Sequence, residues 1–165
     1  MIGTMRGWIM ASATALAFGA PLGATAQTAP PPATRPAAQM AAEAAIKWGL
    51  IGTWAPSCER PPGDRNVYVR YVARDDGRVV MERDLGAPAR NDTTEVLAAV
   101  IGKDGNIEVV IDLRAFAMVR VYALAKDGDK RLRALWNRQI GGDHTIRDGR
   151  FTANGAEVPW QYRCG

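Results

Sequence analysis

Ile107-Glu108-Val109-Val110-Ile111-Asp112-Leu113 is the stretch that decides the fold class of this chain. Apolar side chains alternate here with mostly polar ones, and a period of two is typical of a half-buried antiparallel strand. Working outward from this stretch, strands are predicted near residues 50–56, 66–74, 78–85, 93–102, 106–113, 118–126, 130–139 and 144–163. The chain is therefore predicted to be mostly β.

Short turn signals separate these strands, and each joins an acidic or amide residue to glycine. They are Asp76-Gly77, Asp104-Gly105, Asp127-Gly128, Asp148-Gly149 and Asn154-Gly155. Such pairs accept the positive φ of tight hairpins, so consecutive strands should be antiparallel neighbours. About eight strands joined up and down can close into a barrel, which removes exposed sheet edges. The prediction is an antiparallel up-and-down β-barrel.

The alternation also assigns side chains to the two faces of the sheet. On the predicted core face lie Val67, Val69, Tyr71, Ile107, Val109, Val119, Val121, Ala123, Ala125, Leu132, Ala134 and Trp136. On the opposite face lie Tyr68, Arg70, Arg74, Arg120, Tyr122, Arg131 and Arg133. A barrel of this size either fills its interior with side chains or leaves room for one small ligand, and the sequence leaves both open.

The N-terminal part of the chain divides into three segments. Residues 1–26 read as a signal peptide, with a positive Arg6, an apolar stretch and the small-residue cleavage pattern that ends at Ala26. Residues 27–38 form a Pro/Ala-rich linker, because proline removes backbone donors and favours extended chain. Residues 39–165 form the domain, which opens with a short helix over 38–50. The mature chain should hold no membrane span.

Composition argues against several classes of function. The formal net charge is only +4, without the dense basic stripe of a nucleic-acid binder. His144 is the sole histidine and Ser57 the sole serine after residue 26, and neither lies in a catalytic or metal-binding motif. We therefore expect no enzyme activity, no metal and no cofactor.

Cys58 and Cys164 are the only cysteines, near the two ends of the predicted domain. Secretion places them in an oxidising compartment, periplasmic or extracellular, where a disulfide between them is expected; two free thiols are the alternative. The bond would join the first strand to the last across a loop of roughly one hundred residues, with a stabilising effect of at most about 4.7 kcal/mol.

The segment Trp48-Gly49-Leu50-Ile51-Gly52-Thr53-Trp54 joins the helix to a Gly-x-Trp on the first strand. This resembles the start of lipocalins and the wider calycin group. The resemblance implies that Trp54 plugs one barrel end, that Arg163 packs over it, and that the barrel encloses a cavity. The whole domain also resembles small secreted bacterial proteins with Gly-x-Trp-x-x-x-Cys and a C-terminal Trp-x-x-x-Cys, a group that implies no particular activity.

Two functions compete at this stage. The first is a non-enzymatic binding protein for a small apolar or amphipathic ligand inside the barrel, lined by Val69, Tyr71, Val109, Val121 and Trp136. The second is a protein-binding module, either an inhibitor of a secreted hydrolase or an envelope accessory factor. Its outer-face residues would be Tyr68, Arg70, Arg120, Tyr122 and Arg133, since arginine and tyrosine are common interface anchors.

Overall fold

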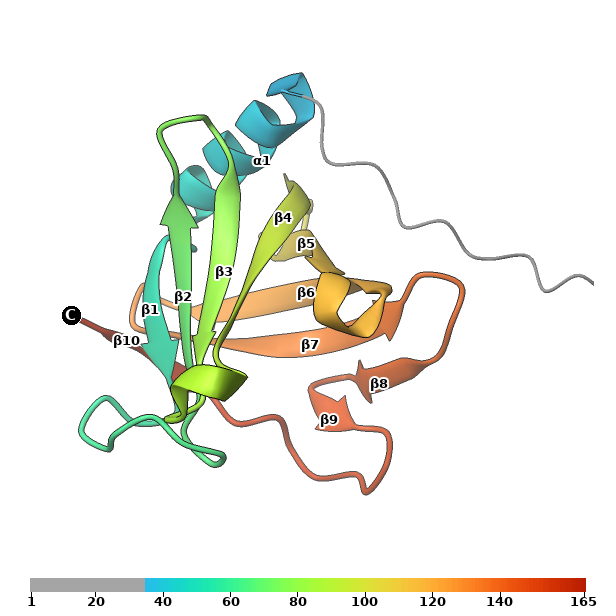
Figure 1. Cartoon of the computed structure of the whole chain (residues 1–165). Coiled ribbons are helices and arrows are strands. Elements are labelled where there is room, and N and C mark those ends of the chain that lie inside the picture. The colour runs from blue at the N-terminus through green and yellow to red at the C-terminus, as the bar shows by residue number, and fades with distance from the viewer. Residues whose placement is uncertain (1–34) are drawn as a thin grey trace, which may run out of the picture.

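Eight antiparallel strands close into a barrel in the computed structural model of the chain, which describes residues 35–165 (Figure 1). The elements, in chain order, are α1 (Arg35–Trp48), β1 (Gly52–Ala55), β2 (Tyr68–Ala73), β3 (Val79–Asp84), the 3₁₀ helix η1 (Pro88–Arg90), β4 (Asp92–Ile101), β5 (Ile107–Leu113), the 3₁₀ helix η2 (Arg114–Phe116), β6 (Met118–Asp127), β7 (Arg131–Gln139), β8 (His144–Arg147), β9 (Arg150–Phe151) and β10 (Gln161–Cys164). The predicted fold class, mostly β with a short N-terminal helix, is confirmed.

Closure of the barrel depends on β10. Strands β1 to β7 each pair with the next in sequence, and β10 pairs with both β1 and β7. Thr53 lies opposite Cys164 on one side of β10, and Leu132 lies opposite Gln161 on the other. The hairpin β8–β9 continues from β7 as an extension beside the barrel. Strand β1 has no free edge, because it is hydrogen-bonded to β10 on one side and to β2 on the other.

The turn chemistry agrees with the backbone. In each of the five predicted turns the glycine has a positive φ, between 59° and 81°. A non-glycine residue adopts such angles only at a cost, so these glycines permit the tight reversals between strands.

Helix α1 starts earlier than its sequence pattern suggests. It begins at Arg35 rather than Ala38, so residues 35–38, predicted as the end of the linker, form its first turn. The rest of the predicted linker and the signal peptide lie outside the described residues. One face of α1 carries small buried side chains at helical spacing, Ala38, Ala41, Ala42 and Ala45. Small residues let the helix approach the barrel closely.

The interior face of β6 differs from the prediction. Val109 lies opposite Tyr122, and Ile107 lies opposite Leu124, so Tyr122 and Leu124 point inward and Val121 outward. Partners directly opposite each other in a sheet share a face, so the assignment of Val121 to the core face is wrong, as are those of Val119, Ala123 and Ala125. Leu124 belongs to the buried core cluster and Tyr122 packs against it.

A bulge in β7 reverses the face of Trp136. Ala134 lies opposite Leu124, but Trp136 lies opposite Ala123, and the extra residue between them is Leu135. An extra residue shifts everything beyond it to the other face. Ala134 therefore points into the barrel, whereas Trp136 lies on the outer face, where its ring meets His144 edge-on at 6.0 Å. The prediction that Trp136 lines the core is wrong for this reason.

The predicted disulfide is present. Cys58 and Cys164 are bonded, with their Cα atoms 5.3 Å apart. Cys58 follows β1 and Cys164 ends β10, so the bond ties together the two strands whose pairing closes the barrel.

Candidate functional site

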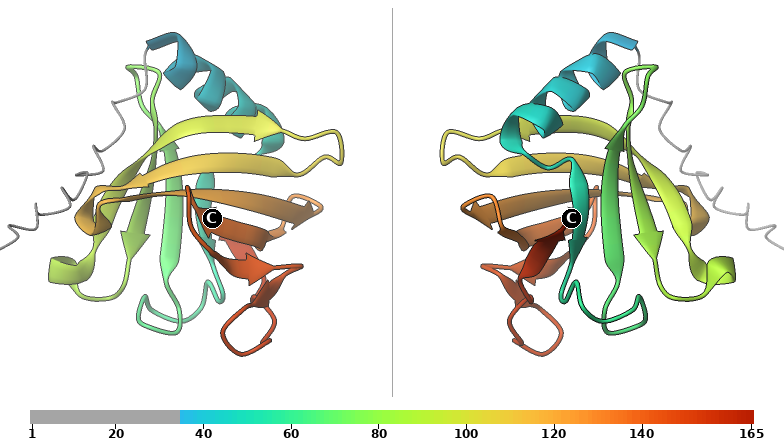
Figure 2. Two further views of the ribbon diagram at one scale, coloured as in Figure 1. Left: turned by 90° about the vertical axis from the view of Figure 1, so that its right-hand side faces the viewer. Right: turned by 90° about the vertical axis from the view of Figure 1, so that its left-hand side faces the viewer.

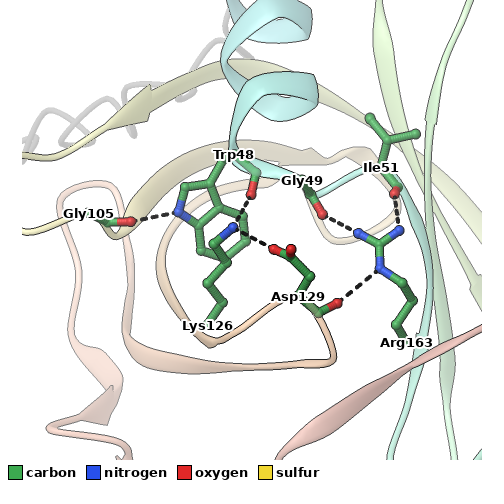
Figure 3. A network of polar contacts seen from close by, with 7 residues as sticks. All are labelled: Trp48, Gly49, Ile51, Gly105, Lys126, Asp129 and Arg163. Carbon is green, nitrogen blue, oxygen red and sulfur yellow. Dashed lines mark hydrogen bonds and ion pairs between the residues drawn. The ribbon is translucent and has the colours of Figure 1, made fainter.

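Helix α1 closes one end of the barrel. Figure 2 shows it running above β4, with the β2–β3 turn beside its N-terminal end and the β4–β5 turn near its C-terminal end. The indole Nε1 of Trp48 donates to the carbonyl of Gly105 at 2.7 Å, and Lys126 Nζ donates to the carbonyl of Trp48 at 2.9 Å (Figure 3). Lys126 also binds Asp129. These contacts fix the C-terminal end of the helix to two of the turns.

Arg163 of β10 completes this closed end. Its guanidinium lies 4.6 Å from the centre of the Trp54 ring and donates to the carbonyls of Gly49 and Ile51 (Figure 3). A third hydrogen bond, at 3.3 Å, reaches the carbonyl of Asp129. Trp54 is only 1% exposed, so the arginine covers a buried aromatic ring. This is the packing that the sequence resemblance implied for Trp54 and Arg163.

A cavity of about 280 Å³ lies inside the barrel, beyond this closed end. Its wall is mainly apolar and comes from six strands of the barrel: β2, β3, β5, β6, β7 and β10. Tyr71, Met81, Ile111, Leu124 and Ala134 each contribute one side chain. The first four are buried, which shows that the cavity lies within the core rather than on its surface.

The mouth of the cavity is formed by the C-terminal extension. Ile146 of β8 and Phe151 of β9 line it, together with Val158 and Pro159 from the segment leading into β10. Phe151 is 37% exposed, whereas Ile146 and Val158 are buried. The hairpin β8–β9 and residues 152–160 therefore lie at the end of the barrel opposite α1 (Figure 1).

A few polar groups interrupt the apolar wall. Arg83 of β3 binds Asp92 of β4 through two nitrogens, one of them at 2.8 Å. Tyr71 and Tyr122 come from β2 and β6, which are opposite walls of the closed barrel. Gln161 of β10 is the remaining polar residue of the lining. A mostly apolar site with a small number of polar groups is typical of small-molecule pockets.

Burial changes the acidity of both tyrosines. Desolvation raises the pKa of Tyr71 well above its ordinary value, and the nearby phenol of Tyr122 adds to the rise. Desolvation also raises the pKa of Tyr122, against the opposing influence of Arg120, Arg83 and Asn137. Because removal from water penalises the charged form, both phenols remain neutral donors across the physiological pH range.

Of the five residues that the sequence analysis proposed to line the ligand cavity, only two do so. Val69 and Tyr71 line the cavity. Val109 is completely buried and belongs to the hydrophobic core cluster. Val121 and Trp136 lie on the outer face of β6 and β7, so they do not reach the interior.

The five proposed interface residues are also divided. Tyr122 lines the cavity, and Arg120 shares the inner face of β6, where it binds Asn137 and Thr145. Tyr68 and Arg70 lie on the outside of β2, and Arg133 stacks on Trp160 outside β7. β2 and β7 are separated by β1 and β10 in the sheet, so these residues do not form one patch.

Tyr68 and Arg70 border a second hollow, of about 550 Å³, on the outer face of β2, β3 and β4. The charged groups in it already bind one another, since Glu82 accepts from both Arg70 and Arg74. The Tyr68 hydroxyl is engaged as well, by the carbonyls of Cys58 and Arg60. Arg70, Glu82 and the Tyr68 hydroxyl are therefore already engaged within the chain.

The residues considered for catalysis are not brought together. The backbone of Ser57 is held by Asn66, while His144 contacts Trp136 and Arg147. Within residues 35–165 no group of three His, Cys, Asp or Glu side chains is placed to hold a metal ion. In the same range, every helix is too short or too polar to cross a membrane.

No protein-family model matches the chain, and no match was found among curated proteins or solved structures. The chemistry of the cavity therefore has to be argued from its own residues.

Sequence reasoning placed Val69, Tyr71 and Ala134 on the core face but missed Arg83, Tyr122 and the whole mouth of the cavity. Arg83 sits in a segment whose two faces are both mixed, so no alternation marks it as inward-pointing. Ile146, Phe151 and Val158 lie in a region read as one long strand with a further hairpin. Side-chain size could have identified the inward face of β6. Tyr122 and Leu124 are larger than Val121 and Ala123, and the larger pair fills the interior.

Proposed function

We propose that the protein is a non-enzymatic binding protein of the periplasm or extracellular space, and that it holds a small apolar or amphipathic ligand inside the barrel. The observation that supports this proposal best is the 280 Å³ apolar cavity, closed by α1 at one end and open beside β8–β9 at the other. The Cys58–Cys164 disulfide agrees with an oxidising compartment.

The size of the cavity limits the ligand. Ligand pockets commonly measure about 300–1,000 Å³, so this one is at the small end. An apolar cavity of about 150 Å³ accommodates benzene, which suggests a ligand of about ten or eleven non-hydrogen atoms here. We infer a compact molecule with one or two rings or a short alkyl chain.

The closed end supports a lipocalin-like reading of the fold. Trp54 on the first strand and Arg163 on the last are direct partners in the sheet and stack against each other. This arrangement is similar to the one by which lipocalins seal the end of their barrel. The similarity concerns one end only, and the proposal for ligand binding rests on the cavity.

Filling the cavity tests the proposal. In Ala134→Phe, a large ring replaces an inward methyl group opposite Leu124. The matched control is Ala125→Phe, because Ala125 lies opposite Arg133 on the outer face of the same strand pair. We expect wild type and Ala125→Phe to bind the fluorescent neutral probe 2-naphthol, and Ala134→Phe to lose at least about tenfold in affinity, or about 1.4 kcal/mol.

A second, smaller substitution distinguishes loss of cavity volume from misfolding of the variant. Ala134→Leu adds less volume and should weaken binding by a smaller factor, with a melting temperature closer to wild type. Equal binding by wild type and Ala134→Phe would contradict the interior site. Absence of binding to wild type across 2-naphthol, small alkylbenzenes, aryl ketones and medium-chain alcohols would contradict the proposed function itself.

A further inference from the structure

The hydroxyl of Tyr71 is a polar group placed inside an apolar cavity. Tyr71 is 6% exposed and lines the cavity from β2. Among the hydrogen bonds between residues 35–165, none involves this hydroxyl. Its oxygen is accessible from the cavity rather than enclosed by protein, so the hydroxyl can donate to a group that enters the cavity.

The other polar side chains of the cavity wall are less deeply buried than Tyr71. Arg83 directs two nitrogens at Asp92, which also neutralises its charge. Tyr122, on the opposite wall, and Gln161 of β10 are half-buried, whereas Tyr71 is buried. Tyr71 is therefore the polar group best placed to meet a ligand deep in the cavity.

The surroundings of Tyr71 favour an uncharged ligand group. Val69, Met81 and Leu124 line the same cavity, and Asp92 neutralises the charge of Arg83 in its wall. Arg120, whose charge acts on Tyr122, lies outside the lining and directs its donors at Asn137 and Thr145. Burial raises the pKa of Tyr71 because its anion would be poorly solvated here. A ligand carboxylate in the same place would lose its hydration in the same way.

We propose that the cavity selects a small neutral amphiphile whose acceptor oxygen, of the kind found in ketones, esters and ethers, accepts a hydrogen bond from Tyr71. Tyr71 is thus the residue that determines specificity, while the apolar wall supplies most of the affinity. This inference rests on the proposed function, since it concerns the same cavity.

Three probes of nearly equal size separate these contributions. Acetophenone carries a neutral carbonyl, ethylbenzene has a methylene group in its place, and benzoate carries an anionic carboxylate. Dissociation constants for all three are measured by isothermal titration calorimetry at pH 7 with wild type, Tyr71→Phe and Tyr162→Phe. The last variant is the matched control, because Tyr162 lies outside on β10 and is 44% exposed.

Wild type should bind acetophenone about five- to tenfold more tightly than ethylbenzene, as a single neutral hydrogen bond allows. Benzoate should bind more weakly than acetophenone. In Tyr71→Phe the preference for acetophenone should disappear while the affinity for ethylbenzene is kept or improved. Tyr162→Phe should behave as wild type does.

Other outcomes overturn the inference. If wild type binds acetophenone no more tightly than ethylbenzene, or prefers benzoate, the selection for a neutral acceptor is wrong, although the proposed binding function stands. The same holds if Tyr71→Phe keeps the preference. If none of the three probes binds to wild type, the inference fails, and the proposed function fails with it only if 2-naphthol and the medium-chain alcohols do not bind either.

Discussion

Arg163 is the residue on which the closed end depends most. Its flat guanidinium stacks on Trp54 and donates to three backbone carbonyls, those of Gly49, Ile51 and Asp129. A lysine has the same charge but neither the planar surface nor the forked set of donors. We expect Arg163→Lys to lower the free energy of unfolding by about 2–3 kcal/mol, from the lost stacking and hydrogen bonds. Urea denaturation measures this change.

Arg65→Lys is the matched control for that substitution. Arg65 is exposed in the loop between β1 and β2, and replacements at such sites usually change stability by less than about 0.5 kcal/mol. If Arg163→Lys were as harmless as Arg65→Lys, the contacts of Arg163 would be incidental to the closed end.

Tyr71 should make the barrel sensitive to alkaline pH. Burial raises its pKa in the folded state above the unfolded value of about 10, so its contribution to stability is fully present below pH 10. Above that pH the unfolded chain loses the phenolic proton while the folded one keeps it. The contribution of this group therefore falls by about 1.4 kcal/mol per pH unit.

The Tyr71→Phe variant isolates this effect. Over about one and a half pH units above pH 10, wild type should lose more unfolding free energy than Tyr71→Phe does. Urea denaturation at several pH values gives both curves. Parallel curves would mean that the phenol of Tyr71 ionises equally easily in the folded and unfolded states.

At the level of elements, the strands were predictable because turn chemistry and alternation point the same way. Each Asp-Gly or Asn-Gly pair marks a reversal, and the glycines do adopt positive φ. Ile107 to Leu113 became β5 with the expected boundaries, since its apolar and polar faces differ strongly. The pairing of Cys58 with Cys164 followed from there being two cysteines.

Faces were predictable only where one side of a strand is clearly polar. Both sides of β6 are largely apolar, with Val121 and Ala123 on one and Tyr122 and Leu124 on the other. Val121 and Ala123 point away from the core, yet they are only 7% and 4% exposed. Both faces of β6 are therefore buried. In β7 the extra residue Leu135 shifts the register, and the strand contains no glycine or proline that would indicate a bulge.

For the whole molecule, closure has two parts: hydrogen bonding of β10 to its neighbours, and the disulfide. We expect the double variant Cys58→Ala, Cys164→Ala to lose about 2–4 kcal/mol of unfolding free energy, because the unfolded chain regains freedom. It should still form the barrel, since the pairing of β10 with β1 and β7 does not involve sulfur. Urea denaturation and far-ultraviolet circular dichroism measure both properties.

Wild type reduced with dithiothreitol provides the comparison for the double variant. The two should have matching denaturation curves, because both lack the cross-link. An unfolded spectrum for either would show that strand pairing alone cannot hold β10 in place.

The two ends of the barrel differ, and this difference has a kinetic consequence. Under the proposed function, a bound molecule would enter and leave past β8–β9 and Val158, because α1 packs over the other end. Any change in the hairpin that narrows this route without touching the bound molecule slows arrival and departure by the same factor. On that proposal, a change in the hairpin would alter the residence time of the ligand without altering the equilibrium constant, which would be determined by the strands of the barrel.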